Sequence, residues 1–367
     1  MAKNYLLYVG TYTQSSSPPA HRDEGIFVFR FDAETGALER LSAAGGALNP
    51  SFLALHPNGG FLYAVSEILD YQGKDSGAVH AYARDRATGA LTHLNTQATI
   101  GTWPCHLNVD SSGRYVLIAN YLSGSVAMLP IRTDGSLGEA SGFVQHQGSS
   151  VNPQRQEGPH AHAIMIAPDN RFAFAPDLGL DQVLSYRLDL ERGKLVVNDP
   201  PGVSVAPGAG PRHFDFHPNG RWAYLINEIG STLSAYTYDA QRGALTLMNT
   251  VPTLPAGFGG TSHTADIHVH PSGKFVYGSN RGHDSITICA IDQGTGQVSV
   301  VGQESTQGKT PRNFAIDPTG AFLLAANQST DNIVVFRIDA QSGRLSPTGH
   351  SAPAPAPVCL KLIPAGN

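Results

Sequence analysis

The sequence is poor in charged residues. Asp, Glu, Lys and Arg make up 14% of the 367 positions, whereas about 25% is usual in a globular protein. The formal net charge is −5, which argues against a broad nucleic-acid-binding surface or an anchor on an anionic membrane. The chain also carries 40 glycines and 25 prolines, so its composition favours short strands and tight turns over long surface helices.

Cysteines and long hydrophobic runs are scarce. Cys105, Cys289 and Cys359 are far apart and form no CxxC pair. We therefore expect neither a disulfide framework nor a structural zinc site, and we expect a reducing compartment, the cytoplasm. No apolar run reaches the ~18 residues of a membrane-spanning helix, and the initial MAKNYLLYVGTYT lacks the hydrophobic region and cleavage site of a signal peptide.

Several catalytic motifs are also missing. The sequence has no GxSxG elbow, no phosphate-binding P-loop, no HExxH and no GxGxxG that follows a strand. It therefore offers no local signature of the enzyme classes that use them. Trp103 precedes proline and Trp222 precedes alanine, so the Trp-Asp dipeptide of WD40 repeats is absent.

Two interleaved repeats are present instead. The first joins an aspartate to a glycine and then an aliphatic residue, as in DAETGAL and DAQSGRL, and it centres on Gly36, Gly89, Gly135, Gly193, Gly243, Gly296 and Gly343. The glycines are on average about 51 residues apart, a spacing typical of propeller blades. Each motif follows an alternating run such as GIFVFRFD, which is the pattern of a β-hairpin.

The second repeat is a strand, a Pro/Asp/Gly turn and another strand, as in GPRHFDFHPNGRWAYLINE. Six complete copies occur, and the seventh is split between residues 357–363 and residues 5–13. The two repeats together predict an all-β fold, a seven-bladed β-propeller with four antiparallel strands per blade. The C-terminal strand should join the N-terminal blade and close the ring, with residues 1–367 as a single domain. A pair of β-sandwiches, the alternative, would not give seven repeats in register.

The propeller geometry predicts where polar groups converge. The start of each first strand lies beside the end of each second strand, and in a propeller these ends from several blades surround one mouth of the central channel. The first-strand starts carry His106, His160, His162, Arg212, His213, His263 and Arg312. The second-strand ends carry Glu67, Asn120, Tyr121, Asp177, Asn227, Glu228, Asn280, Arg281 and Asn327. We expect a ligand site there, because the sequence is otherwise poor in charge.

Some of these residues have a simpler interpretation. His56, His217 and His270 belong to His-Pro turns on the far face and are expected to be structural, and the recurring asparagines are expected to cap turns. His160 and His162 are two residues apart on a predicted strand, a spacing that suits a metal, as do His268 and His270. No third ligand is evident for either pair, so we expect no metal and no cofactor.

The motifs YVGTYT, GPRHFDFHPNGRWAYLINE, ADIHVHPSGKFVYGSNR and PRNFAIDPTGAFLLAANQ resemble those of the seven-bladed propeller lactonases. That family includes propeller-type 6-phosphogluconolactonases and 3-carboxy-cis,cis-muconate lactonizing enzymes. The resemblance covers the whole chain and implies catalytic roles for His162, Arg212, Glu228 and Arg281.

Residues 147–162 form a longer entry loop than in compact bacterial members and add Arg155 and His160 near the mouth. We expect His106, Tyr121, His160 and Arg312 to bind substrate.

The function that this resemblance implies is hydrolysis of a sugar or sugar-phosphate lactone, most directly 6-phosphogluconolactone. His162 would act as general base and then acid, Glu228 would orient it or be the base itself, and Arg212 and Arg281 would stabilise the oxyanion or clamp an anionic group. The alternatives are a muconate-type lactonizing enzyme, a hydrolase of another acidic lactone, a metal-dependent gluconolactonase and a non-catalytic binding propeller. The expected partner is a small anionic lactone, with no nucleic acid or membrane, and the chain is expected to be a monomer or weak homodimer.

Overall fold

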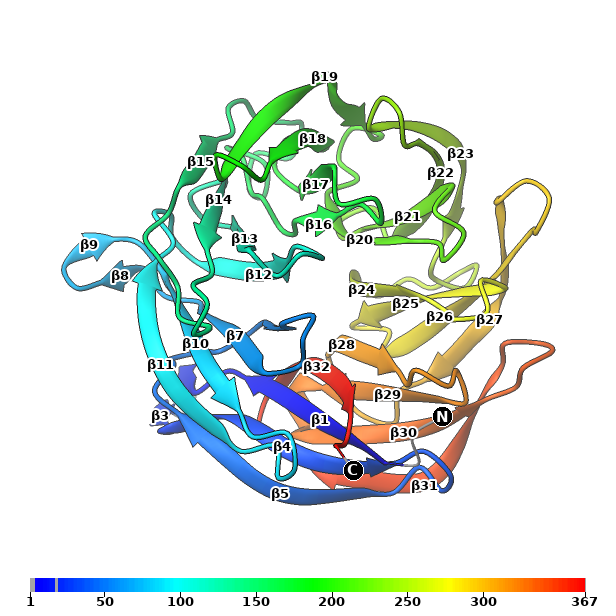
Figure 1. Ribbon diagram of the computed structural model, residues 1–367. Helices are drawn as coiled ribbons and strands as arrows, with labels where there is room; N and C mark the ends of the chain where they lie inside the picture. Colours follow the sequence, from blue (N-terminus) through cyan, green and yellow to red (C-terminus); the bar gives the residue numbers. More distant parts are fainter. Residues whose placement is uncertain (1–3, 17–18, 367) are drawn as a thin grey trace.

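The structure, a computed structural model, describes residues 4–16 and 19–366 and forms a closed ring of seven four-stranded antiparallel sheets (Figure 1). Each blade is given from the channel outward. Blade 1 consists of β32 (Pro357–Pro364), β1 (Asn4–Thr11), β4 (Glu24–Asp32) and β5 (Leu38–Gly45), and blade 2 of β6 (Leu53–Leu55), β7 (Phe61–Ser66), β10 (Ala78–Arg84) and β11 (Leu91–Ala98). Blade 3 consists of β12 (Pro104–Val109), β13 (Tyr115–Asn120), β14 (Ser125–Pro130) and β15 (Gly142–Gln145). The predicted fold class is therefore confirmed.

The remaining blades repeat this order. Blade 4 consists of β16 (Met165–Ile166), β17 (Phe172–Asp177), β18 (Gln182–Asp189) and β19 (Lys194–Ser204), and blade 5 of β20 (Pro211–Phe216), β21 (Trp222–Asn227), β22 (Thr232–Asp239) and β23 (Ala244–Pro252). Blade 6 consists of β24 (His263–Val269), β25 (Phe275–Arg281), β26 (Ser285–Ile291) and β27 (Val298–Ser305), and blade 7 of β28 (Pro311–Ile316), β29 (Phe322–Asn327), β30 (Asn332–Ile338) and β31 (Leu345–Pro353). Two short hairpins, β2 (Gln14–Ser16) with β3 (Pro19–His21) and β8 (Asp70–Tyr71) with β9 (Lys74–Asp75), and a 3-10 helix, Gln328–Thr330, complete the described part.

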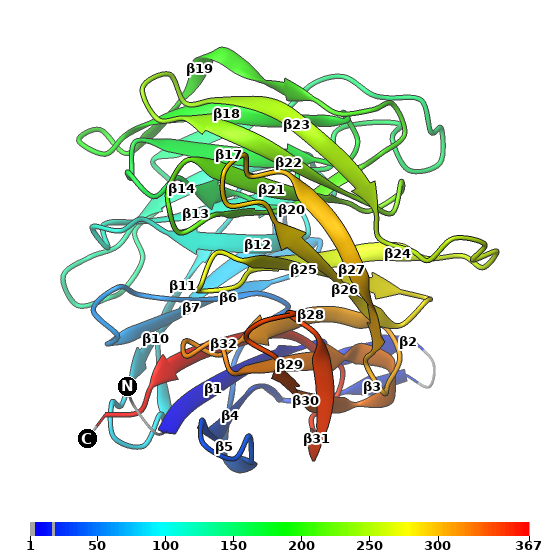
Figure 2. The same cartoon turned by 90° about the vertical axis from the view of Figure 1, so that its right-hand side faces the viewer.

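Ring closure occurs in blade 1. The C-terminal strand β32 pairs with β1, which in turn pairs with β4. This pairing places the C-terminal strand next to the channel and joins the two ends of the chain in one sheet, which closes the ring. The connecting loops gather on the two faces of the ring (Figure 2). No helix in the described ranges is long and apolar enough to cross a membrane.

The repeated glycines hold neighbouring blades together. Gly135 has a φ of +83°, and an added Cβ would lie 2.2 Å from the Phe61 ring of the preceding blade. The carbonyl oxygen of Gly135 accepts a hydrogen bond from the Tyr63 hydroxyl. Gly89, Gly296 and Gly343 accept the same kind of tyrosine bond. The turn motif therefore sets both the hairpin and the distance between blades.

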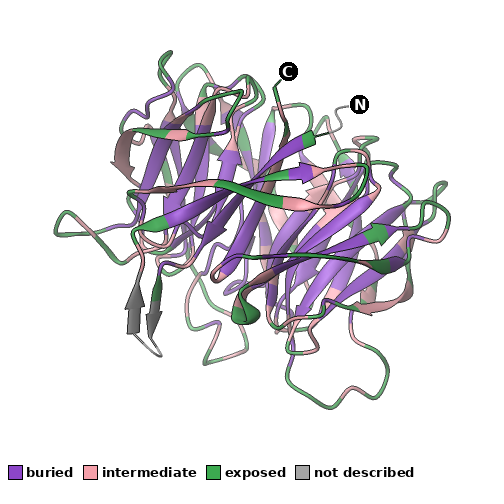
Figure 3. Ribbon diagram, turned by 90° about the horizontal axis from the view of Figure 1, so that it is seen from below, coloured by how far each residue is buried: buried purple, intermediate pink, exposed green. Residues whose placement is uncertain are grey.

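The His-Pro turns form a second set of links. His56, His217 and His270 bond through Nε2 to the carbonyl oxygens of Gly113, Gly273 and Gly320, each in the following blade. Their predicted structural role is confirmed. Asn120, Asn227, Asn280 and Asn327 likewise donate from Nδ2 to nearby loop and strand oxygens. Buried residues lie along the strands between blades, whereas the loops and outer strands are exposed (Figure 3).

Candidate active site

A β-bulge opens several inner strands and decides which side chains enter the channel. In β20 the register shifts between Pro211 and His213, so Arg212 is the extra residue. Arg312 in β28 and Cys105 in β12 occupy the same position. A bulge turns a side chain away from the normal alternation of a strand. Consecutive residues such as Arg212 and His213 therefore line one cavity.

At the channel mouth, Glu228 follows β21 and binds three arginines. Its Oε2 accepts from Arg212 Nε at 2.9 Å and lies 3.0 Å from Arg281 Nη2, while its Oε1 accepts from Arg155 Nη2 at 2.7 Å. Arg212 also donates to the carbonyl oxygen of Ala265, and Arg281 donates to that of Thr264 at 2.9 Å. We call Glu228 with Arg155, Arg212 and Arg281 the arginine cluster.

The arginine cluster fixes the charge of its carboxylate. Burial alone would raise the pKa of Glu228, but Arg281 and Arg212, together with His162 and Arg155, hold it well below its usual range. Burial and repulsion from Arg281 and Arg312 lower the pKa of Arg212 to about 10. Glu228 is therefore an anion at neutral pH and a weak base.

His162 lies beside the cluster but outside a regular strand. The predicted strand position is wrong, because β16 spans only Met165–Ile166 and residues 160–162 are held by an isolated bridge between Ala161 and Asp177. The Nε2 atom of His162 is 3.7 Å from Glu228 Oε2, and its Nδ1 is 3.6 Å from the Cys105 sulfur. Burial, followed by Arg212, lowers the pKa of His162 well below its usual value, so the ring is neutral at neutral pH.

The entry loop brings further predicted residues to the mouth. The ring of Tyr121 stacks on His160, with centroids 4.7 Å apart, and meets His162 edge-on at 5.0 Å. Arg155 reaches from the loop to both the Tyr121 hydroxyl, at 3.5 Å, and Glu228. The sequence predicted that Arg155 lies near the mouth but did not predict its ion pair with Glu228.

Arg312 completes the mouth from the seventh blade. It lies over the Tyr12 ring at 5.6 Å, and the Tyr12 hydroxyl donates to both oxygens of Glu67. Tyr12 belongs to the YVGTYT motif, so a signal for it existed in the sequence, although we did not predict it as a site residue. Within the described ranges Arg312 has no ion-pair partner at 4.0 Å or less.

Three rings divide the channel. His106, His213 and Phe52 form a constriction, with ring centroids 5.4 Å apart between the histidines and 4.2 Å apart between Phe52 and His106. On the mouth side a small cavity, the mouth cavity, is lined by Ser51, Phe52, Glu67, Cys105, Arg212, His213, Arg312 and Val358. His106 lies at this constriction, deeper than predicted.

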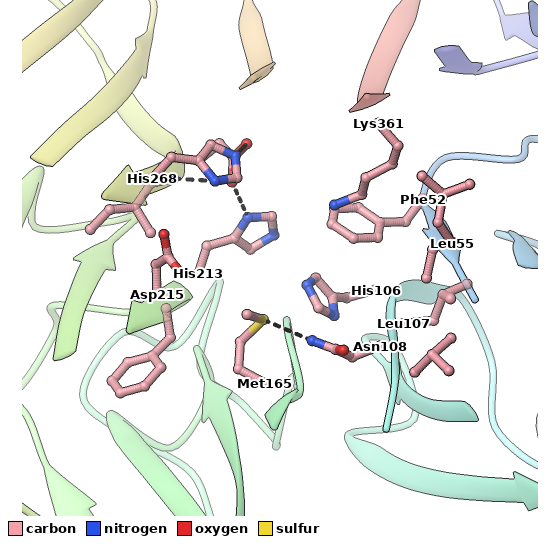
Figure 4. A pocket seen from close by; sticks show the side chains of 15 residues that line it. Phe52, Leu55, His106, Leu107, Asn108, Met165, His213, Asp215, His268 and Lys361 are labelled. Atoms are coloured by element: carbon pink, nitrogen blue, oxygen red, sulfur yellow. Dashed lines mark hydrogen bonds and ion pairs between the residues drawn. The ribbon is translucent and has the colours of Figure 1, made fainter. Parts of the chain in front are cut away.

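Beyond the constriction a larger cavity, the far cavity, opens between the inner strands (Figure 4). Lys361, Asp215, Asp266, His268 and Met165 are among its lining residues. The side chains of His213 and Phe52 line both cavities. Among residues 4–16 and 19–366, no group of three or more His, Cys, Asp or Glu side chains is arranged to hold a metal ion.

Fold and site together define a seven-bladed propeller whose channel mouth brings several arginines together around one glutamate. Residues 6–362 match the model of the family described as lactonase, 7-bladed beta-propeller, and the chain belongs to this family.

Named relatives match most of the chain. The chain is 38% identical to a 6-phosphogluconolactonase of Bacillus subtilis, over 85% of each protein, and 35% identical to one of Formosa agariphila, over 85% of this chain and 86% of the relative. Among solved structures, the periplasmic gluconolactonase of Pseudomonas aeruginosa superposes with a TM-score of 0.91 at 36% identity, covering 99% of this chain and 100% of that one.

Proposed function

We propose that the protein hydrolyses 6-phosphogluconolactone to 6-phosphogluconate at the channel mouth. The observation that carries this proposal is the arginine cluster, in which Glu228 balances only part of the positive charge that Arg155, Arg212 and Arg281 bring together. Members of the same family named for this activity support the choice of substrate. A lactone that carries a phosphate is a small anion of the kind that such a site attracts.

Arg312 is the proposed anchor for the phosphate. It lines the mouth cavity together with Arg212 and has no ion-pair partner among the described side chains. Interaction with Tyr12, Glu67 and Glu228 outweighs burial and raises the pKa of Arg312, so it remains a cation. A guanidinium can bind two phosphate oxygens at once. His160 and Tyr121, stacked at the rim, are the proposed contacts for the sugar hydroxyls, and His106 is the proposed contact for any part of the ligand that reaches the constriction.

Hydrolysis passes through a tetrahedral oxyanion. Arg212, Arg281 and the neutral His162 surround Glu228, and we assign them to stabilise that oxyanion, while Glu228 holds them in place. Glu228 does not suit the role of base, because its pKa is held well below its usual range. Each ring nitrogen of His162 already has a neighbour, the Glu228 carboxylate on one side and the Cys105 thiol on the other, so we do not assign His162 as the base.

A test of the function is a coupled assay on freshly prepared 6-phosphoglucono-δ-lactone, with glucono-δ-lactone in parallel and with and without EDTA. We expect fast hydrolysis of the phosphorylated lactone that EDTA does not change. Equal rates on both lactones would favour the activity named for the Pseudomonas aeruginosa neighbour. An EDTA-sensitive rate would indicate the metal-dependent alternative, and no acceleration over buffer on either lactone would refute the proposal and direct attention to muconate-type lactones.

We further propose a cytoplasmic location and a monomer or weak homodimer. Three free, buried cysteines support a reducing compartment. The relation to a periplasmic gluconolactonase makes cell fractionation the appropriate test, and light scattering would give the oligomeric state.

A further inference from the structure

His213 forms a buried pair with Asp266 that the roles assigned so far do not use. The Nδ1 atom of His213, on β20, lies 2.7 Å from Asp266 Oδ1 on β24. Asp266 is also held by His268 Nε2 at 2.9 Å, by the backbone N–H of Ile267 at 3.0 Å and by the side-chain amide of Asn313. Burial alone would raise the pKa of Asp266, but His268 and His213 hold it well below its usual value, so the carboxylate is ionised.

The contact with Asp266 determines the tautomer of His213. An ionised carboxylate can only accept a hydrogen bond, so the proton lies on Nδ1 and Nε2 carries a lone pair. That Nε2 is buried and has no hydrogen-bond partner among the described residues. Figure 4 shows the His213 ring pointing into the channel toward His106, and its Nδ1 edge contacts Asp266. A buried polar atom without a partner destabilises the folded state, which is a reason to look for a function.

The position of His213 brings it to the reaction site. Because of the bulge at Arg212, both residues line the mouth cavity. The His213 ring meets that of His162 edge-on, with centroids 5.5 Å apart. A carbonyl group bound by Arg212 in this cavity would share it with the His213 ring.

We propose that His213, oriented by Asp266, is the general base of lactone hydrolysis. This inference rests on the proposed function and names the proton acceptor that it lacks. As the water oxygen bonds to the lactone carbonyl carbon, one water proton passes to His213 Nε2, and the carbonyl electrons move to the oxygen beside Arg212. When the ring C–O bond breaks, the His213 imidazolium returns that proton to the leaving oxygen, and the second proton is lost as the carboxylic acid ionises. No oxidant, metal or further reactant is needed.

The surroundings of His213 set a specific pH dependence. Asp266 and His268 on β24, His106 on β12, His162 ahead of β16 and the adjacent Arg212 all face it. Burial and then Arg212 lower the pKa of His213 to about 4. The base should therefore remain unprotonated above about pH 5, and the rate should fall on acidification only near pH 4.

The test compares two substitutions of the same histidine. His213→Asn keeps a side-chain N–H that can donate to Asp266 but removes the lone pair at Nε2. General acid–base catalysis contributes about 10²–10⁴-fold, so we expect His213→Asn to lower kcat at least ~100-fold while KM changes less than threefold. His213→Gln should be equally inactive. The matched control is His217→Asn, a buried histidine that bonds to Gly273 on the far face, and its kcat should stay within about twofold of the wild type.

Two further measurements decide the case if His213→Asn does not fold. Asp266→Asn replaces the acceptor of His213 by a group that can donate, and it should lower kcat without a matching rise in KM. The wild-type pH–rate profile should have its acid limb near pH 4. A His213→Asn protein with near wild-type kcat, or a wild-type acid limb near pH 6.5, would overturn the inference and leave the lactonase proposal intact. A wild type without lactonase activity would refute the proposed function itself.

Discussion

Replacing Glu228 by glutamine tests whether the arginine cluster depends on that carboxylate. The substitution keeps the size of the side chain but leaves Arg212, Arg281 and Arg155 without their shared counter-charge. Removing one partner of a buried ion pair costs about 3–5 kcal/mol. Arg155 contributes little to this free-energy cost, because its side chain is 35% exposed and solvent weakens ion pairs that are exposed. Arg212 and Arg281, whose side chains are 2% and 16% exposed, account for most of the effect.

The expected change in melting temperature follows from the chain length. With about 2.1 cal/mol/K of unfolding entropy per residue, the 367-residue chain loses about 1.3 °C for each kcal/mol. Glu228→Gln should therefore melt about 4–6 °C below the wild type at pH 7 in differential scanning calorimetry. The folded-state pKa of Glu228 is depressed, so its contribution is complete above the unfolded pKa and is lost as the pH falls toward the folded pKa. The difference between the two proteins should shrink below about pH 4.5.

An exposed glutamate supplies the control for this comparison. Among the described residues, Glu157 forms one ion pair, with His160 at 3.2 Å, and its side chain is 58% exposed. Glu157→Gln should therefore melt within about 1 °C of the wild type. If Glu228→Gln melts as the wild type does at pH 7, or if its deficit is the same at pH 7 and pH 3.5, the carboxylate is not the counter-charge of the cluster and the argument fails.

Three other predictions address the substrate and the blades. Arg281→Ala should lower kcat at least ~100-fold, since removing one oxyanion donor costs about 3–4 kcal/mol, and a loss below fivefold in the lactonase assay would refute its role. Arg312→Gln should raise KM for the phosphorylated lactone about 10-fold or more, because a hydrogen bond to a charged group contributes about 1.5–3 kcal/mol. The KM for glucono-δ-lactone should change little. Equal effects on both lactones would exclude a contact between Arg312 and the phosphate. The free energy of unfolding in urea should be about 1–3 kcal/mol lower for Gly135→Ala than for Gly349→Ala. Both glycines have a φ of +83°, but of the two only Gly135 lies so close to a ring, that of Phe61, that a new Cβ would clash with it. Equal losses would show that the backbone angle alone matters.

The architecture was predictable because the same local rules act in every blade. The turn at Gly135 needs a left-handed residue and a close approach to Phe61, and the other turn glycines meet neighbouring side chains in the same way. These requirements recur in every blade, so the same residue types repeat at regular intervals along the sequence and the number of blades can be counted. The split seventh blade was predictable for the same reason, since residues 357–363 lack a second strand and residues 5–13 lack a first one.

The sequence predicted which strand ends carry the polar residues of the site, but it did not predict the contacts between those residues. Arg212, Glu228 and Arg281 do meet, because the blades bring those ends to one mouth. The contact between Arg155 and Glu228 depends on the path of a long loop, which no periodicity encodes. His162 lies outside a strand because the backbone N–H of His160 binds the side chain of Asp177 in place of a regular ladder partner.

The bulge explains why His213 was the residue hardest to assign from the sequence. In a regular strand, neighbouring side chains point to opposite faces, so Arg212 and His213 could not both face the mouth cavity. The single extra residue after Pro211 removes that restriction, and the same shift recurs after Pro104 and Pro311. In β20 this shift lets two consecutive side chains, Arg212 and His213, line the same cavity, where alternation allows one. In the mechanism proposed above, Arg212 stabilises the developing charge and the next residue, His213, takes the proton. The bulges of β12, β20 and β28 each follow a proline at the strand start, which is the sequence signal for them.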